Sequence, residues 1–233
     1  MSNLKIVGHR ANHVRRITFY LKNRVDLIEF DVKIQNGKLV VYHGSPLYSS
    51  TTLTEAIIRK ALDQLLARDD LLSPLSINHA LEVIERFESN SRVGLWLDLK
   101  SDVDVDFIIE LLNDRLVGGD RELVVSSTNY MLISEVKKKL GDSVKTAISI
   151  SFKPLDTEML QYITRRTSCD ILSIEASIFD SWFKREALKL GLETAVWVVN
   201  SPSLASKLAG LDPDYIITDR PDLVIPVLKG SKK

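Results

Sequence analysis

The residues of this sequence best suited to chemistry are charged side chains placed inside, or directly after, short apolar runs. Glu29 and Asp31 lie two positions apart within one apolar run, and Asp98 and Lys100 form a second pair of this kind. Side chains at positions i and i+2 of a strand leave it on the same face. Three carboxylates from neighbouring strands could therefore hold a hard divalent cation such as Mg²⁺ or Ca²⁺ through oxygen ligands.

The apolar neighbours of Glu29 and Asp31 predict that both carboxylates are buried. Burying unpaired carboxylates is costly unless a cation or several hydrogen-bond donors compensate them. A metal ion is one such cation. A structural salt bridge to Lys100 or Arg10 is the alternative, and the residues alone leave both interpretations open.

Two of the four histidines stand at the ends of predicted strands, beside these acidic pairs. His9 follows the first apolar run and directly precedes Arg10, and His43 ends the return arm of a predicted hairpin. Near neutral pH such a pair of histidines could act as general base and general acid. Arg10 and Lys100 could neutralise a phosphate, which arginine can bind through two parallel hydrogen bonds.

These residues depend on elements that alternate along the whole chain. Near-continuous apolar runs are typical of strands buried on both faces of a parallel sheet, and they occupy residues 4–7, 27–32, 93–99, 122–126, 144–150, 170–174, 194–199 and 214–218. Helical spacing of apolar residues separates many of them, at residues 76–84, 103–116, 131–140, 158–165 and 182–190. An Asn-Gly pair at residues 36–37 predicts a β-hairpin whose return strand covers residues 38–43.

Eight such repeats within 233 residues favour a (β/α)8 barrel of the TIM type, with a short hairpin after the second strand. A doubly wound open sheet is the alternative. Residues 1–228 are expected to form a single barrel domain, and residues 229–233 a flexible tail. In such barrels the active site lies at the carboxyl ends of the strands, where the charged residues above are found.

Composition argues against several classes of function. The 31 Lys and Arg residues balance the 31 Asp and Glu residues, so a broad surface for nucleic acid or anionic membrane is not expected. Cys169 is the one cysteine, which excludes an internal disulfide and favours a cytoplasmic location. The sequence lacks a signal-peptide pattern and any apolar run of about 18 residues, so we expect no membrane anchor.

Taken together, these motifs resemble the glycerophosphodiester phosphodiesterase family. Residues 8–10 resemble its opening His-Arg motif, and residues 28–43 resemble its Glu-x-Asp-Val strand and the hairpin that ends in the second histidine. The other motifs that carry the resemblance are found in the same order as in the family, at residues 97–100, 124–127, 191–200 and 214–221. The resemblance covers nearly the whole chain.

The resemblance implies metal-assisted hydrolysis of a small glycerophosphodiester to glycerol 3-phosphate and an alcohol. It also implies one bound divalent ion (Mg²⁺ or Ca²⁺, with Mn²⁺ as a further option). From the balanced charge we expect no nucleic-acid partner and no stable membrane association. The implied roles are metal ligands for Glu29, Asp31 and Asp98, acid–base catalysis for His9 and His43, phosphate contacts for Arg10 and Lys100, and an alcohol-group pocket lined by Trp197. Which histidine is the acid, and whether water or a glycerol hydroxyl attacks first, stay open.

Three departures from the family pattern mark a divergent, short member without an inserted small domain. Ala11 replaces the usual glycine, Gly44 a common aspartate, and Asp98 the usual glutamate. They keep two alternatives open: a barrel that cleaves phospholipid headgroups and releases a cyclic phosphate, and an inactive phosphate-binding barrel. The oligomeric state is also open.

Overall fold

The computed structural model describes residues 4–35, 38–41, 75–87, 92–100, 104–115, 121–154 and 156–230. Its strands are β1 (Lys5–Gly8), β2 (Leu27–Gln35), β3 (Lys38–Val41), β4 (Gly94–Leu99), β5 (Leu123–Ser127), β6 (Lys145–Ile150), β7 (Ile171–Glu175), β8 (Glu193–Trp197) and β9 (Tyr215–Thr218). Its helices are α1 (Val14–Lys22), α3 (Ile77–Phe87), α4 (Val105–Arg115), α5 (Tyr130–Leu140), α6 (Thr157–Thr167), α7 (Ser181–Leu190), α8 (Pro202–Ala209) and α9 (Pro221–Gly230), with a short 3₁₀ turn η2 (Gly141–Ser143).

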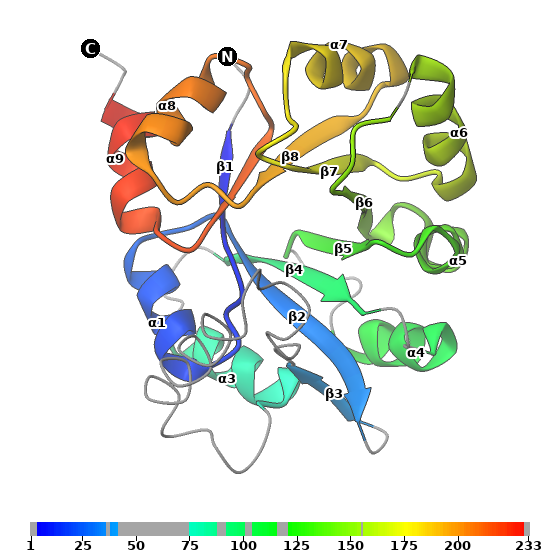
Figure 1. Cartoon of the computed structure of the whole chain (residues 1–233). Coiled ribbons are helices and arrows are strands. Elements are labelled where there is room, and N and C mark those ends of the chain that lie inside the picture. Colours follow the sequence, from blue (N-terminus) through cyan, green and yellow to red (C-terminus); the bar gives the residue numbers. More distant parts are fainter. Residues whose placement is uncertain are drawn as a thin grey trace, which may run out of the picture.

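Eight of the strands form a closed parallel barrel with helices around it, as predicted (Figure 1). The order around the barrel is β1-β9-β8-β7-β6-β5-β4-β2, and pairing of β1 with β2 closes the ring. This closure excludes the open-sheet alternative. Strand β3 pairs antiparallel with β2 outside the barrel, which confirms the predicted hairpin.

Three helices, α1, α8 and α9, were not among those predicted from sequence spacing. Helix α1 has only nine residues, of which Ile17 and Tyr20 are buried and Val14, Phe19 and Leu21 are partly buried against the core. Helix α9 contains Pro226, which normally argues against a helix interior. Because α9 runs to Gly230, residues 229–230 are helical rather than part of a flexible tail, and residues 231–233 lie outside the described residues.

The interior of the barrel is filled by side chains, because alternate residues of each strand point inward. An apolar layer crosses the middle, and it consists of Val7, Leu27, Trp96, Val124, Ala147, Ile171, Ala195, Tyr215 and Ile217. The carboxyl ends of the same strands carry the charged residues singled out above. The apolar layer therefore supports the candidate site from below.

The amino-terminal mouth of the barrel is covered by a charged layer at the starts of the strands. Lys5 pairs with Glu122 at 2.7 Å, and Lys145 pairs with Glu193 at 2.6 Å. The Tyr215 hydroxyl lies between the two pairs, 2.9 Å from Glu122 Oε1 and 3.1 Å from Glu193 Oε2. Two lysines and two glutamates thus neutralise one another around a buried tyrosine.

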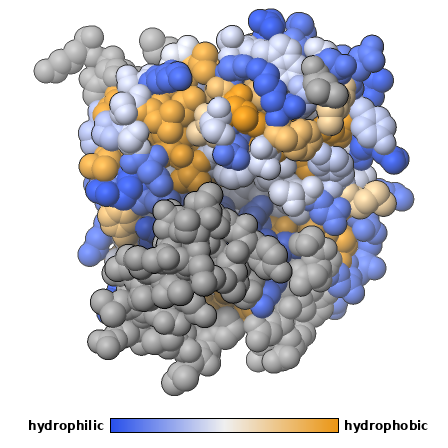
Figure 2. Space-filling view, viewed as in Figure 1, coloured by the Kyte–Doolittle hydropathy of each residue, from blue (hydrophilic) through white to orange (hydrophobic). Residues whose placement is uncertain are grey.

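Exposed hydrophobic side chains do not gather on a single face of the described surface. In the view of Figure 2, hydrophilic and hydrophobic residues are interspersed over the part of the surface that is coloured. The large hydrophobic side chains exposed in the described residues are spread over several elements, namely Phe87, Met131, Phe152, Tyr162, Leu188 and Leu223. No helix among the described residues is long and apolar enough to cross a membrane.

Close packing at the end of β1 makes one position unusually sensitive to size. A Cβ atom added to Gly8 would lie 2.5 Å from the ring carbon Cγ of Tyr20, which is fully buried. The Tyr20 hydroxyl also donates a hydrogen bond of 2.5 Å to the carbonyl oxygen of His9. Gly8→Ala is therefore expected to lower the free energy of unfolding by about 1–3 kcal/mol, as overpacked sites do.

Chemical denaturation of the purified proteins measures this effect. Gly210→Ala is the matched control, because the nearest atom to an added Cβ there is 3.4 Å away, at ordinary contact distance. Equal unfolding free energies for the two variants would contradict the packing argument.

Candidate active site

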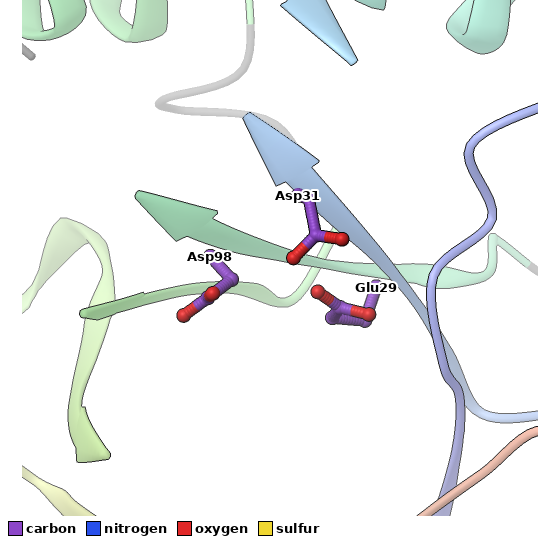
Figure 3. A group of neighbouring side chains, drawn as sticks. All are labelled: Glu29, Asp31 and Asp98. Carbon is purple, nitrogen blue, oxygen red and sulfur yellow. The ribbon is translucent and has the colours of Figure 1, made fainter. Parts of the chain in front are cut away.

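Three carboxylates meet at the carboxyl ends of two neighbouring strands (Figure 3). Glu29 and Asp31 leave the same face of β2, and the pairing of β2 with β4 places Asp98 directly beside Asp31. One oxygen atom from each of the three residues lies within 4.8 Å of the other two. The structure thus brings together the three residues predicted as metal ligands.

Two carboxylates of this cluster are buried, and their negative charges favour a nearby cation. Glu29 and Asp31 are only 4% and 3% exposed. Burial, together with the charges of Asp31 and Asp98, raises the pKa of Glu29 well above its usual value, although the Arg10 backbone N–H and the Lys100 charge oppose the shift. The cluster therefore favours an additional cation.

Lys100 supplies one cation from within the chain. Its Nζ atom lies 2.5 Å from both Asp31 Oδ1 and Asp98 Oδ2. Burial opposes protonation of Lys100, but the two carboxylates more than compensate and raise its pKa above the usual value. The lysine predicted as a phosphate contact thus lies against the carboxylates here.

The segment after β1 contributes hydrogen bonds to the same cluster. Arg10 has a φ of 52°, and its backbone N–H donates to Glu29 Oε2 at 2.5 Å. The Arg10 side chain approaches Asp31 Oδ2 at 3.4 Å, with its guanidinium about half exposed. Asn12, which the sequence analysis did not single out, donates from Nδ2 to Asp31 Oδ2 at 3.1 Å.

Asp98 is oriented by a short hydrogen-bonded chain on the inner barrel wall. Ser126 Oγ on β5 donates to Asp98 Oδ1 at 2.7 Å and accepts from Trp96 Nε1 at 2.8 Å. A shorter aspartate side chain, in place of the glutamate usual in the family that the sequence resembles, thus still reaches the cluster. Its direction is set by Ser126, which the sequence analysis did not assign.

His9 is held by residues to which no role was assigned from the sequence, although Asp219 and Asn200 lie in the motifs at residues 214–221 and 191–200. Its Nδ1 atom lies 3.1 Å from Asp219 Oδ1, just after β9. The same carboxylate accepts hydrogen bonds from Arg16 Nη2 at 2.6 Å and from Asn200 Nδ2 at 2.7 Å. Burial opposes ionisation of Asp219, but the hydrogen bond and charge of His9, with Asn200 and Arg16, lower its pKa to about 2. Asp219 is therefore anionic at neutral pH.

Of the other two predicted site residues, only Trp197 is among the described residues. Trp197 ends β8, on the far side of the barrel from β2, and its buried indole Nε1 has no hydrogen-bond partner in the described part of the chain. His43 and Gly44 lie outside the described residues, as does the segment 42–74 as a whole. The role predicted for His43 stays a prediction.

The chemistry of the donor set fits a hard divalent cation. The three residues offer carboxylate oxygens alone, which are the ligands that Mg²⁺ and Ca²⁺ prefer. Their mutual distances allow one ion to contact all three residues. Because Glu29 and Asp31 are buried, a bound cation would offset the cost of burying their charges. The site could hold a metal ion, and its ligand set does not distinguish among the hard cations.

The fold and the site together define a barrel enzyme with an acidic centre at the carboxyl ends of its strands. The model of the Glycerophosphoryl diester phosphodiesterase family matches residues 20–223. The chain belongs to this family and is a phosphoric diester hydrolase.

Individual relatives are distant in sequence but similar over their full length. The Bacillus subtilis (strain 168) protein YhdW, provisionally named a glycerophosphodiester phosphodiesterase, is 22% identical over 94% of this chain and 96% of its own. An Oleispira antarctica phosphodiesterase, solved with the product sn-glycerol-3-phosphate, has a TM-score of 0.76 at 20% identity, covering 97% of this chain and 96% of that one. A Thermotoga maritima glycerophosphodiester phosphodiesterase has a TM-score of 0.70 at 18% identity, covering 97% and 99%.

Proposed function

We propose that this protein hydrolyses glycerophosphodiesters to sn-glycerol 3-phosphate and an alcohol, with one divalent cation. The observation that carries the proposal is the buried cluster of Glu29, Asp31 and Asp98 with His9 held nearby by Asp219. The bound product named for the Oleispira antarctica relative supports the same substrate class.

The three carboxylates would hold the cation, which is Mg²⁺ or Ca²⁺, with Mn²⁺ as a further option. Such a cation, when bound, polarises a phosphate oxygen and favours deprotonation of the attacking oxygen. Lys100 and Arg10 lie beside the same carboxylates, where their charges neutralise the phosphate of a bound diester. Trp197 lines the part of the barrel that receives the alcohol group.

Proton transfer is assigned to His9 and His43. Because Asp219 holds Nδ1 of His9, Nε2 is the ring nitrogen left to exchange a proton with the substrate. One histidine accepts the proton of the attacking hydroxyl or water, and the other protonates the departing alkoxide. The contact with the anionic Asp219 orients the imidazole ring of His9.

Hydrolysis of glycerophosphocholine and glycerophosphoethanolamine, coupled to detection of sn-glycerol 3-phosphate, tests the proposal. Parallel reactions contain EDTA, Mg²⁺, Ca²⁺ or Mn²⁺, for the wild type and for His43→Ala. We expect activity that requires a metal and is lost in the variant. Absence of turnover with every metal and diester would reject the proposal, and ³¹P NMR at early times shows whether a cyclic phosphate is formed first.

Lys100 gives a second test, because its ammonium competes with a metal for Asp31 Oδ1 and Asp98 Oδ2. Lys100→Met is expected to bind Mg²⁺ more tightly than the wild type, yet to turn over the diester more slowly because a phosphate contact is lost. Isothermal titration calorimetry measures the affinity. Lys153→Met removes a surface lysine paired with Asp180 and serves as control. Unchanged or weaker Mg²⁺ binding by Lys100→Met would contradict the competition.

A cytoplasmic location is part of the proposal. The sequence holds one cysteine, Cys169, which is buried and forms no disulfide in the structure. Such cysteine usage fits a reducing compartment. Fractionation of cells that produce the protein tests the location.

A further inference from the structure

A second acidic residue stands at the carboxyl end of the barrel, away from the three-carboxylate cluster. Glu175 is the last residue of β7, and it follows Ile171 and Ser173 at alternate positions. Ile171 belongs to the apolar layer inside the barrel, so the same strand face, which includes Glu175, points inward. The strand pairing places Trp197 of β8 directly beside Glu175.

Glu175 has no cationic partner among the described residues. Its carboxylate accepts one hydrogen bond, from Ser177 Oγ at 2.8 Å. Four other acidic residues on the inner face form ion pairs with lysines, namely Asp31, Asp98, Glu122 and Glu193, and Glu29 accepts a hydrogen bond from the Arg10 backbone N–H. A partly buried carboxylate without a cation is a place where a positively charged ligand group gains interaction energy.

The backbone around the pair is fixed, so the two side chains start from defined positions. The N–H of Ala176 donates to the carbonyl oxygen of Trp197 at 2.6 Å, which ties the end of β7 to the end of β8. The carbonyl oxygen of Glu175 accepts from the N–H of Ile178 at 3.1 Å. Glu175 and Trp197 therefore extend from neighbouring backbone positions that hydrogen bonds hold together.

The pair lies across the barrel from the candidate metal ligands. In the closed strand order, β7 is four strands from β2 in either direction, and Figure 1 shows β7 and β8 on the opposite side from β2 and β4. If the phosphate of a diester lies against the cluster on β2 and β4, an arm directed across the barrel would reach the ends of β7 and β8, where Glu175 and Trp197 are the inward residues.

We propose that Glu175 and Trp197 bind a positively charged amine on the alcohol arm of the substrate, so that diesters of amino alcohols are preferred over diesters of neutral alcohols. The inference rests on the proposed function and adds its specificity. A carboxylate pairs with an ammonium group, and the face of an indole ring attracts the same cation. No function was assigned to Glu175 from the sequence.

The test compares kcat/KM for glycerophosphocholine and for glycerophosphoglycerol, whose alcohol arm is neutral. Glu175→Gln keeps the shape of the side chain and removes its charge. We expect the variant to lose about fivefold in kcat/KM on glycerophosphocholine, as for a partly exposed ion pair, and to be unchanged on glycerophosphoglycerol. Trp197→Phe is expected to keep the preference and Trp197→Leu to lose it, because only phenylalanine retains an aromatic face.

Glu193→Gln is the matched control, since it makes the same change at the other end of the barrel, where Glu193 pairs with Lys145. It is expected to leave the ratio of the two kcat/KM values as in the wild type. An unaltered ratio in Glu175→Gln, or an equal fall on both substrates, would overturn the inference while leaving the hydrolase proposal intact.

A binding measurement keeps the inference testable if neither diester is turned over, which is the outcome that counts against the proposed function. Glycerophosphocholine is titrated calorimetrically into the wild type and into Glu175→Gln, both in EDTA. Weaker binding by the variant supports the amine site, and equal binding, or none by either protein, rejects it.

Discussion

Glu29→Gln is expected to lower the turnover of metal-dependent hydrolysis by about 10³-fold, because a catalytic metal lowers the activation free energy by several kcal/mol. Glutamine keeps the size of the side chain and can still accept the hydrogen bond from the Arg10 backbone N–H. The substitution removes one of three charges that could hold the cation. Steady-state rates with saturating Mg²⁺ and with EDTA measure the loss.

The same variant separates a catalytic loss from a folding defect. In EDTA, Glu29→Gln is expected to unfold at the same temperature as the wild type or higher, because it relieves repulsion among buried carboxylates within 4.8 Å of one another. Mg²⁺ at about 100 times its Kd stabilises the wild type by about 2.7 kcal/mol, and this gain disappears in the variant. Retained activity together with retained Mg²⁺ stabilisation would contradict the metal-site assignment.

Asp219→Asn is expected to lower kcat by about 10²-fold or more, although Asp219 lies outside the acidic cluster, because it contacts His9, the proposed general acid or base. An asparagine at this position presents a neutral amide to Nδ1, which allows the wrong tautomer and orientation of His9. Asp219 acts through His9 and is therefore a positioning residue.

The readout for this prediction is a comparison of kcat and KM in single and double variants. His9→Ala alone is expected to lose about 10³-fold in kcat, within the range for general acid–base catalysis. Adding Asp219→Asn to His9→Ala is expected to cost little more, since the aspartate then has no imidazole to orient. Asp222→Asn, which alters a surface pair with Arg220, is the control. Additive losses in the double variant would mean that Asp219 acts independently of His9.

The sequence predicted the acidic cluster because its geometry follows from local rules. Glu29 and Asp31 share a strand face by alternation, and Asp98 needs only the neighbouring position of β2 and β4. Each of these contacts depends on one strand or on one strand pair. Apolar runs were sufficient to place them.

The support of His9 could not be predicted in the same way. Its contact with Asp219 joins residues 210 positions apart, and it exists only because β9 pairs with β1 where the barrel closes. Arg16 reaches the same carboxylate from α1, a helix of only nine residues. Asn200 and Asn12 are short polar residues in connecting segments, where sequence spacing carries no periodic signal.

The charged layer at the amino-terminal mouth affects how small molecules reach the acidic cluster. It consists of Lys5, Glu122, Lys145, Glu193 and Tyr215. With that mouth covered and the apolar layer packed above it, the barrel is no passage, and molecules reach the acidic centre from one side only. For the proposed hydrolysis, the diester would enter by the opening through which both products leave. A departing product and an arriving diester would then compete for this opening in each catalytic cycle.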